Sequence, residues 1–104
     1  MPGVKVTIVR YISDEPQPGI AECQLEDAHG RRWSFVEKTA NMSRERLDGR
    51  TIYPQQGLIG AEIVQRSLDT TGREVIRVDT GPWGLESDEG VTQFDILPDL
   101  LVDW

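Results

Sequence analysis

The sequence has little of the chemistry that builds metal, redox or hydrolytic sites. It contains one cysteine, Cys23, and one histidine, His29, so it has no Cys-x-x-Cys or His-x-x-x-His spacing and no internal disulfide. Cys23 alternates with Ala21 and Leu25, which predicts a small core residue, and His29 falls inside a turn. A nucleophile therefore has no obvious imidazole base. We expect no catalytic residue, no metal and no cofactor, and predict that the protein is not an enzyme.

The sequence also lacks a long hydrophobic run. No segment approaches the roughly 20 apolar residues of a membrane-spanning helix, so we expect no membrane partner. Residues 1–5 show no apolar segment typical of a secretory signal. Together with the lone cysteine, this predicts a cytoplasmic protein. A length of 104 residues predicts a single domain over residues 1–104.

Basic residues are absent from the last quarter of the chain. Residues 1–78 carry eleven acids and eleven bases, so the whole net charge of −7 lies in residues 79–104. This charge repels nucleic-acid phosphates and favours basic partners or cations, so nucleic acid is an unfavourable partner. A single-stranded nucleic acid on a local patch such as Arg31-Arg32-Trp33 is a disfavoured alternative. A simpler interpretation is that the acids keep a small domain in solution.

Short runs in which apolar and polar residues alternate dominate the rest of the sequence. They predict strands near residues 4–12, 21–26, 32–38, 58–68, 75–78 and 94–96. The turns Asp27-x-x-Gly30-Arg31 and Asp69-x-x-Gly72-Arg73 separate two strand pairs with the same chemistry. This repetition is consistent with an internal duplication and equally with chance. The one helical candidate is a short helix near 43–48, capped by Ser43.

These elements predict a mainly β fold. A small antiparallel barrel of five or six strands would remove the exposed strand edges. The order of elements resembles the OB fold (the oligonucleotide/oligosaccharide-binding fold) with one extra strand. An SH3-like barrel and a compact sandwich are the alternatives. None of these folds indicates a function by itself.

Several short motifs also resemble a set of small bacterial proteins of unknown function. They are Pro18-Gly19-x-x-Glu22-Cys23, Asp27-x-x-Gly30-Arg31-x-Trp33-x-Phe35-x-Glu37-Lys38, Tyr53-Pro54-x-x-Gly57, Pro82-Trp83-Gly84-x-Glu86-Ser87 and Leu97-Pro98. The resemblance implies a free-standing bacterial cytoplasmic domain. It implies no catalytic or binding residue.

The candidate functional segment is the acidic loop 81–90, which carries Trp83 and Glu86. A tryptophan in a loop is typical of protein-binding surfaces, so we predict docking of a protein, and the acidic charge favours a basic one. The alternative role for Trp83 is a plug over the core. A second hypothesis is a small-molecule or saccharide pocket, or a weak active site, formed by Trp83, Tyr53 and Glu37.

Two further expectations concern contacts between chains. Homo-oligomerisation through an edge strand is a third interpretation of the fold. Trp104 is predicted either to anchor the C-terminal tail or to be exposed to another chain.

Overall fold

The computed structural model describes residues 1–103, so both predictions for Trp104 lie outside the described residues. The described chain measures 44 × 27 × 24 Å and is mainly β, as predicted. It contains no helix with the length and hydrophobicity needed to cross a membrane. The strands are β1 (Pro2–Ser13), β2 (Ile20–Glu26), β3 (Arg32–Lys38), β4 (Gln55–Gly60), β5 (Glu62–Leu68), β6 (Glu74–Asp79), β7 (Gln93–Ile96) and β8 (Leu101–Asp103).

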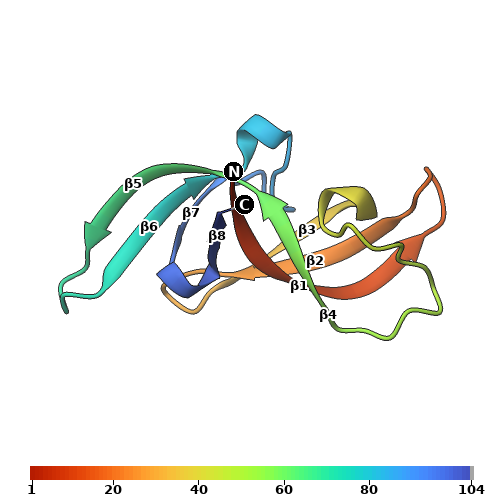
Figure 1. The fold of residues 1–104 in the computed structure, drawn as a ribbon, viewed down its shortest axis with the longest axis horizontal. Helices are drawn as coiled ribbons and strands as arrows, with labels where there is room; N and C mark the ends of the chain where they lie inside the picture. The colour runs from red at the N-terminus through yellow and green to blue at the C-terminus, as the bar shows by residue number, and fades with distance from the viewer. Residues whose placement is uncertain (104) are drawn as a thin grey trace.

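The first sheet is organised around β1. Its order is β3-β2-β1-β4, and β8 also pairs with β1. The N-terminal part of β1 pairs with β8, with Gly3 opposite Val102, and the C-terminal part pairs with β2. All pairings are antiparallel. The two ends of the described chain therefore lie side by side at the centre of the molecule (Figure 1).

The second sheet has the order β5-β6-β7. The β5–β6 hairpin extends away from the body of the molecule (Figure 1). The predicted continuous strand over 58–68 is wrong, because β4 ends at Gly60 in one sheet and β5 begins at Glu62 in the other. Ala61 between them is fully buried, and its N–H donates to the Pro2 carbonyl at 3.3 Å. A buried residue at this position lets the chain change sheets.

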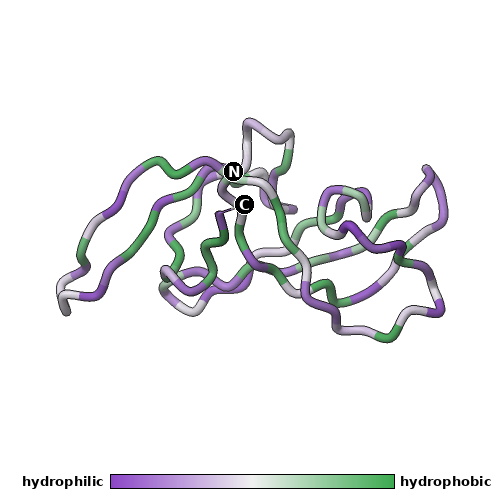
Figure 2. The backbone as a smooth tube through the Cα atoms, in the orientation of Figure 1, coloured by the Kyte–Doolittle hydropathy of each residue, from purple (hydrophilic) through white to green (hydrophobic). Residues whose placement is uncertain are grey.

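One hydrophobic cluster joins the two sheets. Val4, Ile8 and Leu25 of the first sheet belong to the same buried cluster as Ile76 and Val78 of the second. Phe94 on β7 packs against Phe35 and edge-on against Trp33, with ring centroids 5.6 and 5.4 Å apart. Hydrophobic and hydrophilic residues alternate along these strands (Figure 2). Closure into a barrel is not confirmed, because the pairings of residues 1–103 form two separate sheets.

The predicted helix near 43–48 is wrong. The helical segments are short 3-10 turns, η1 (Thr39–Asn41), η2 (Gly81–Trp83) and η3 (Pro98–Leu100). The Ser43 hydroxyl accepts a hydrogen bond from the Glu45 N–H, and the Asp48 carboxylate accepts from the N–H groups of Arg50 and Thr51. These local side-chain bonds satisfy the backbone without a helix.

Candidate functional site

The loop that carries Trp83 is closed by its own backbone and by buried hydroxyl groups. The Thr80 N–H donates to the Thr92 carbonyl, and the Ser87 N–H donates to the Val91 carbonyl, both at 2.9 Å. The fully buried Thr80 hydroxyl donates to the Leu85 carbonyl at 2.8 Å. The buried Ser87 hydroxyl accepts from the Val91 N–H at 3.1 Å. Satisfied buried polar groups of this kind hold a loop in one conformation.

Contacts with the first sheet fix the position of the same loop. The Asp88 N–H donates to the Ser34 carbonyl on β3 at 2.8 Å. Leu85 is buried in the core. The Glu89 carboxylate accepts two hydrogen bonds from the Arg31 guanidinium, at 2.8 and 2.7 Å. The loop 81–90 is therefore attached to the body of the protein along its length.

Trp83 packs against the hydrophobic core and is half-buried. Its indole lies over Gly60 at the end of β4. A Cβ atom added at residue 60 would lie 2.5 Å from both Cδ1 and Nε1 of the indole. Only glycine lets the ring approach the strand this closely. Trp83 thus packs against both β4 and the core cluster, and the rest of its surface is available to solvent.

A cavity of about 220 Å³ lies beside the indole, lined by Ala40, Asn41, Ser43, Arg44, Leu58, Gly60, Trp83 and Leu85. We call it the Trp83 cavity. Asn41 connects it to Glu37, because the Asn41 side chain lies close enough to the Glu37 carboxylate to lower its pKa. Burial raises the pKa of Glu37 above its ordinary value, and the negative charge of Glu86 raises it further. The structure therefore brings Trp83, Glu37 and Glu86 to one region.

Tyr53, the fourth predicted site residue, does not line the Trp83 cavity. Its hydroxyl donates to the Asp48 carbonyl at 2.9 Å, and its ring packs against the core. This hydrogen bond closes the segment between residues 48 and 53.

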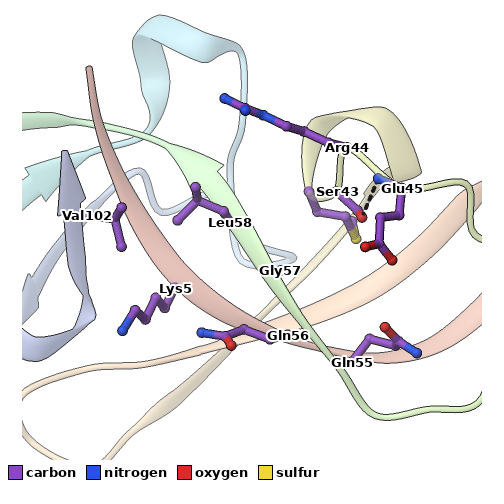
Figure 3. A pocket seen from close by; sticks show the side chains of 10 residues that line it. Lys5, Ser43, Arg44, Glu45, Gln55, Gln56, Gly57, Leu58 and Val102 are labelled. Carbon is purple, nitrogen blue, oxygen red and sulfur yellow. Dashed lines mark hydrogen bonds between the residues drawn. The ribbon is translucent and has the colours of Figure 1, made fainter. Parts of the chain in front are cut away.

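A second depression continues from the Trp83 cavity along β4, and sequence reasoning did not find it. We call it the β4 groove; its volume is about 540 Å³. Lys5 of β1, Leu58 of β4 and Val102 of β8 point into it from the face of the sheet opposite the core (Figure 3). Ser43 and Arg44 line both hollows. The alternation of Lys5 with Val4 and Val6 indicated an outward side chain, but the pairing of β8 with β1 had no local signal.

The basic and aromatic residues near 31–33 are engaged with one another. The Arg31 guanidinium lies 3.7 Å from the Trp33 ring centroid, in addition to its pair with Glu89. The Trp33 indole N–H donates to Asp27 Oδ2 at 2.9 Å. Burial raises the pKa of Asp27, but this hydrogen bond and those from the Arg31 and His29 N–H groups outweigh it, and the pKa is lowered. This cluster connects the β2–β3 turn to the loop 81–90.

No group of three His, Cys, Asp or Glu side chains within residues 1–103 is arranged to hold a metal ion. Cys23 is fully buried, and burial raises the pKa of its thiol to about 12. A thiol with this pKa is a poor nucleophile at neutral pH. Comparison of the chain with protein-family models, with curated proteins and with solved structures gives no match.

Proposed function

We propose that this protein is a non-enzymatic interaction module that docks a protein partner through the loop 81–90 and the Trp83 cavity. The observation that carries the proposal is the position of Trp83. It is a half-buried aromatic side chain on a loop fixed by buried Thr80 and Ser87, beside an open cavity. Tryptophan is enriched among the residues that dominate binding energy, and a preformed loop loses little conformational entropy on binding.

The charges around the loop favour a basic partner. Several acids of the last quarter are already paired: Glu89 with Arg31, Asp95 with Arg77, and Asp103 with the amino terminus. Glu86 and Asp88 are exposed on the loop and make no ion pair within residues 1–103. Glu37 adds a carboxylate that Glu86 already influences. A lysine or arginine of the partner would relieve this repulsion and could stack on the indole.

The test is selection of peptides on the folded protein, followed by calorimetry with purified variants. Random twelve-residue peptides would be panned on the wild type, and enriched sequences should contain lysine or arginine. We expect Trp83→Ala to weaken binding at least tenfold, because truncating a binding hot spot costs about 2 kcal/mol or more. Glu86→Gln should weaken it mainly at low salt.

The matched control is Asp99→Asn, which removes an exposed acid outside the loop and should leave binding unchanged. Peptides that bind wild type, Trp83→Ala and Glu86→Gln equally would contradict the proposal. We also propose that the protein acts in the cytoplasm of a bacterium, where Cys23 would remain a thiol.

A small-molecule or saccharide ligand is the second candidate. The Trp83 cavity combines an aromatic ring with the polar side chains of Asn41 and Ser43, which is the composition of many ligand sites. Such a ligand would use Trp83 and Glu37 but not Tyr53. A thermal-shift screen with neutral sugars distinguishes the two candidates: stabilisation that Trp83→Ala abolishes favours a small-molecule site over a peptide site.

A further inference from the structure

The edge strand β5 differs from the other edge strands in how its edge is covered. Three edge strands each exchange a backbone hydrogen bond with a loop; the pairs are Leu58 on β4 with Met42, Ser34 on β3 with Asp88, and Asp95 on β7 with Ala28. The edge strand β8 has only three residues. Within residues 1–103, no loop bonds the free edge of β5. An uncovered strand edge is a template for pairing with another chain.

The exposure of β5 is unusual for a strand in a small domain. All seven residues of β5 are exposed. They include Ile63, Val64 and Leu68, which are 37%, 50% and 70% accessible to solvent. β5 forms the outer side of the projecting hairpin (Figure 1). The strand therefore offers both unpaired backbone groups and apolar side chains.

The hydrogen-bond pattern of the hairpin shows which backbone groups face outward. The Asp69 N–H donates to the Arg73 carbonyl at 2.9 Å. Because bonded and non-bonded pairs alternate in an antiparallel ladder, Ser67 is bonded to Val75 on β6. The N–H and C=O groups of Arg66 and Leu68 then point away from β6.

The regular part of this free edge is short and centred on Ser67. A bulge between Ile63 and Gln65 interrupts the ladder at one end. The turn that begins at Asp69 ends it at the other. The usable edge is therefore residues 65–69.

We propose that β5 pairs antiparallel with β5 of a second copy of this chain, about a two-fold axis at Ser67. Arg66 of each copy would lie opposite Leu68 of the other, and the two pairs would exchange four backbone hydrogen bonds. The small Ser67 side chains would meet at the axis. No two like charges would lie directly opposite each other, since Gln65 would face Asp69.

Charge identifies a second copy as the occupant. Two copies with a net charge of −7 repel each other, but residues 62–78 contain three acids and three bases. The hairpin is thus a neutral surface on an acidic molecule, and it is where like-charged copies approach with least repulsion. The proposal is independent of the docking function of the loop 81–90.

Sedimentation equilibrium between 10 µM and 1 mM protein tests the proposal. An interface of one short strand per copy lies below the roughly 1,200 Å² of stable complexes, so we expect a weak dimer with a dissociation constant on the order of 0.1 mM. Added salt should strengthen the dimer, because it screens the repulsion between the acidic copies. Hydrogen exchange at Arg66 and Leu68 should slow with concentration, while the amide of Ser67 should be protected at all concentrations.

A matched pair of variants isolates the backbone contribution. Arg66→Pro removes the outward N–H, and Arg66→Thr removes the same guanidinium but keeps the N–H. Loss of two hydrogen bonds per dimer should weaken association at least tenfold in Arg66→Pro relative to Arg66→Thr. Leu68→Lys, at a position 70% exposed, should also dissociate the dimer by placing two positive charges opposite each other.

Trp83→Ala should leave the dimer intact, which separates this proposal from the docking function. If circular dichroism shows that Arg66→Pro does not fold, sedimentation equilibrium of Leu68→Lys tests the proposal instead. A wild type that is monomeric up to 1 mM overturns the proposal. A dimer that survives Leu68→Lys, with unchanged exchange at Arg66, overturns it as well.

Discussion

The close approach of Trp83 to Gly60 can be tested by filling the space between them. Gly60→Ala adds one methyl group at a position where glycine is not required by a left-handed backbone. The new Cβ would lie 2.5 Å from the indole Cδ1 and 2.7 Å from Cγ. Real Cβ contacts are longer, so the ring must tilt or leave its site.

Gly60→Ala should change the free energy of unfolding in opposite directions in the wild type and in the Trp83→Ala variant. Forcing an extra methyl group into a packed site costs about 1–3 kcal/mol. Without the clash, replacing glycine by alanine at a compatible position stabilises a protein by about 0.4–1 kcal/mol, because the unfolded chain loses freedom. Gly60→Ala should therefore destabilise the wild type and stabilise the Trp83→Ala variant. The coupling energy between the two substitutions should be on the order of 2 kcal/mol.

Urea denaturation of the four proteins in this cycle measures the coupling, with far-UV circular dichroism as the probe. Gly49→Ala is the matched control, because a Cβ at residue 49 meets only Tyr11, at 3.9 Å. It should show no coupling to Trp83→Ala. Additivity of Gly60→Ala and Trp83→Ala within about 0.5 kcal/mol would refute the packing of the indole on β4.

Two other predictions concern titratable groups. Burial and Glu86 raise the pKa of Glu37 in the folded state, so its charged form opposes folding above that pKa. Glu37→Gln should therefore raise the free energy of unfolding at pH 7, and this gain should vanish as the pH falls below the unfolded pKa of about 4.3. Urea denaturation of the wild type and the variant at pH 7 and at pH 3.5 checks both expectations. A variant that is less stable than the wild type at pH 7 contradicts the reasoning. Cys23, with a pKa of about 12 and no exposed surface, should resist alkylation by iodoacetamide at pH 8 until urea unfolds the protein. Mass spectrometry measures the fraction of alkylated protein over time. Equal alkylation rates for the folded and the unfolded protein would show that the thiol is accessible in the folded state.

Local chemistry made the hairpins predictable. The turns at Asp27 and Asp69 share their atomic geometry: each Asp Oδ1 accepts from the N–H groups two and four residues later. Gly30 and Gly72 both adopt φ of +82°. Five consecutive residues determine this turn, because they contain both the side chain that bonds the local backbone and the glycine with positive φ. The strands on either side follow from their alternation.

Features that depend on distant residues were not predictable. Ser43 predicts a helix N-cap, yet its side chain and that of Asp48 bond backbone groups in an irregular segment. The change of sheet at Ala61 depends on a contact with Pro2, 59 positions away. Apolar residues on both sides of Ala61 predict one continuous strand, and nothing near it in the sequence indicates the contact with Pro2.

The candidate site shows the same division. Trp83 and Glu86 could be selected from the sequence because a tryptophan in an acidic loop is unusual. Their proximity to Glu37 depends on how the loop 81–90 crosses β3, and the position of Tyr53 depends on its bond to Asp48. Gly60 could not have been linked to Trp83 from its own neighbours, because a glycine that accommodates a ring resembles any other glycine in a strand.

The arrangement of β1 also has a consequence for the time at which the protein can fold. β1 is paired with β8, so Val4 meets Leu101 across almost the whole chain. A ribosome that has released β1 must still synthesise residues 101–103 before that ladder can form. Until then the N-terminal end of β1 is paired with β4 along one edge, and the edge that β8 will cover stays open. A chain stalled before residue 101 would therefore expose this edge, and it is the form we expect chaperones to bind during synthesis.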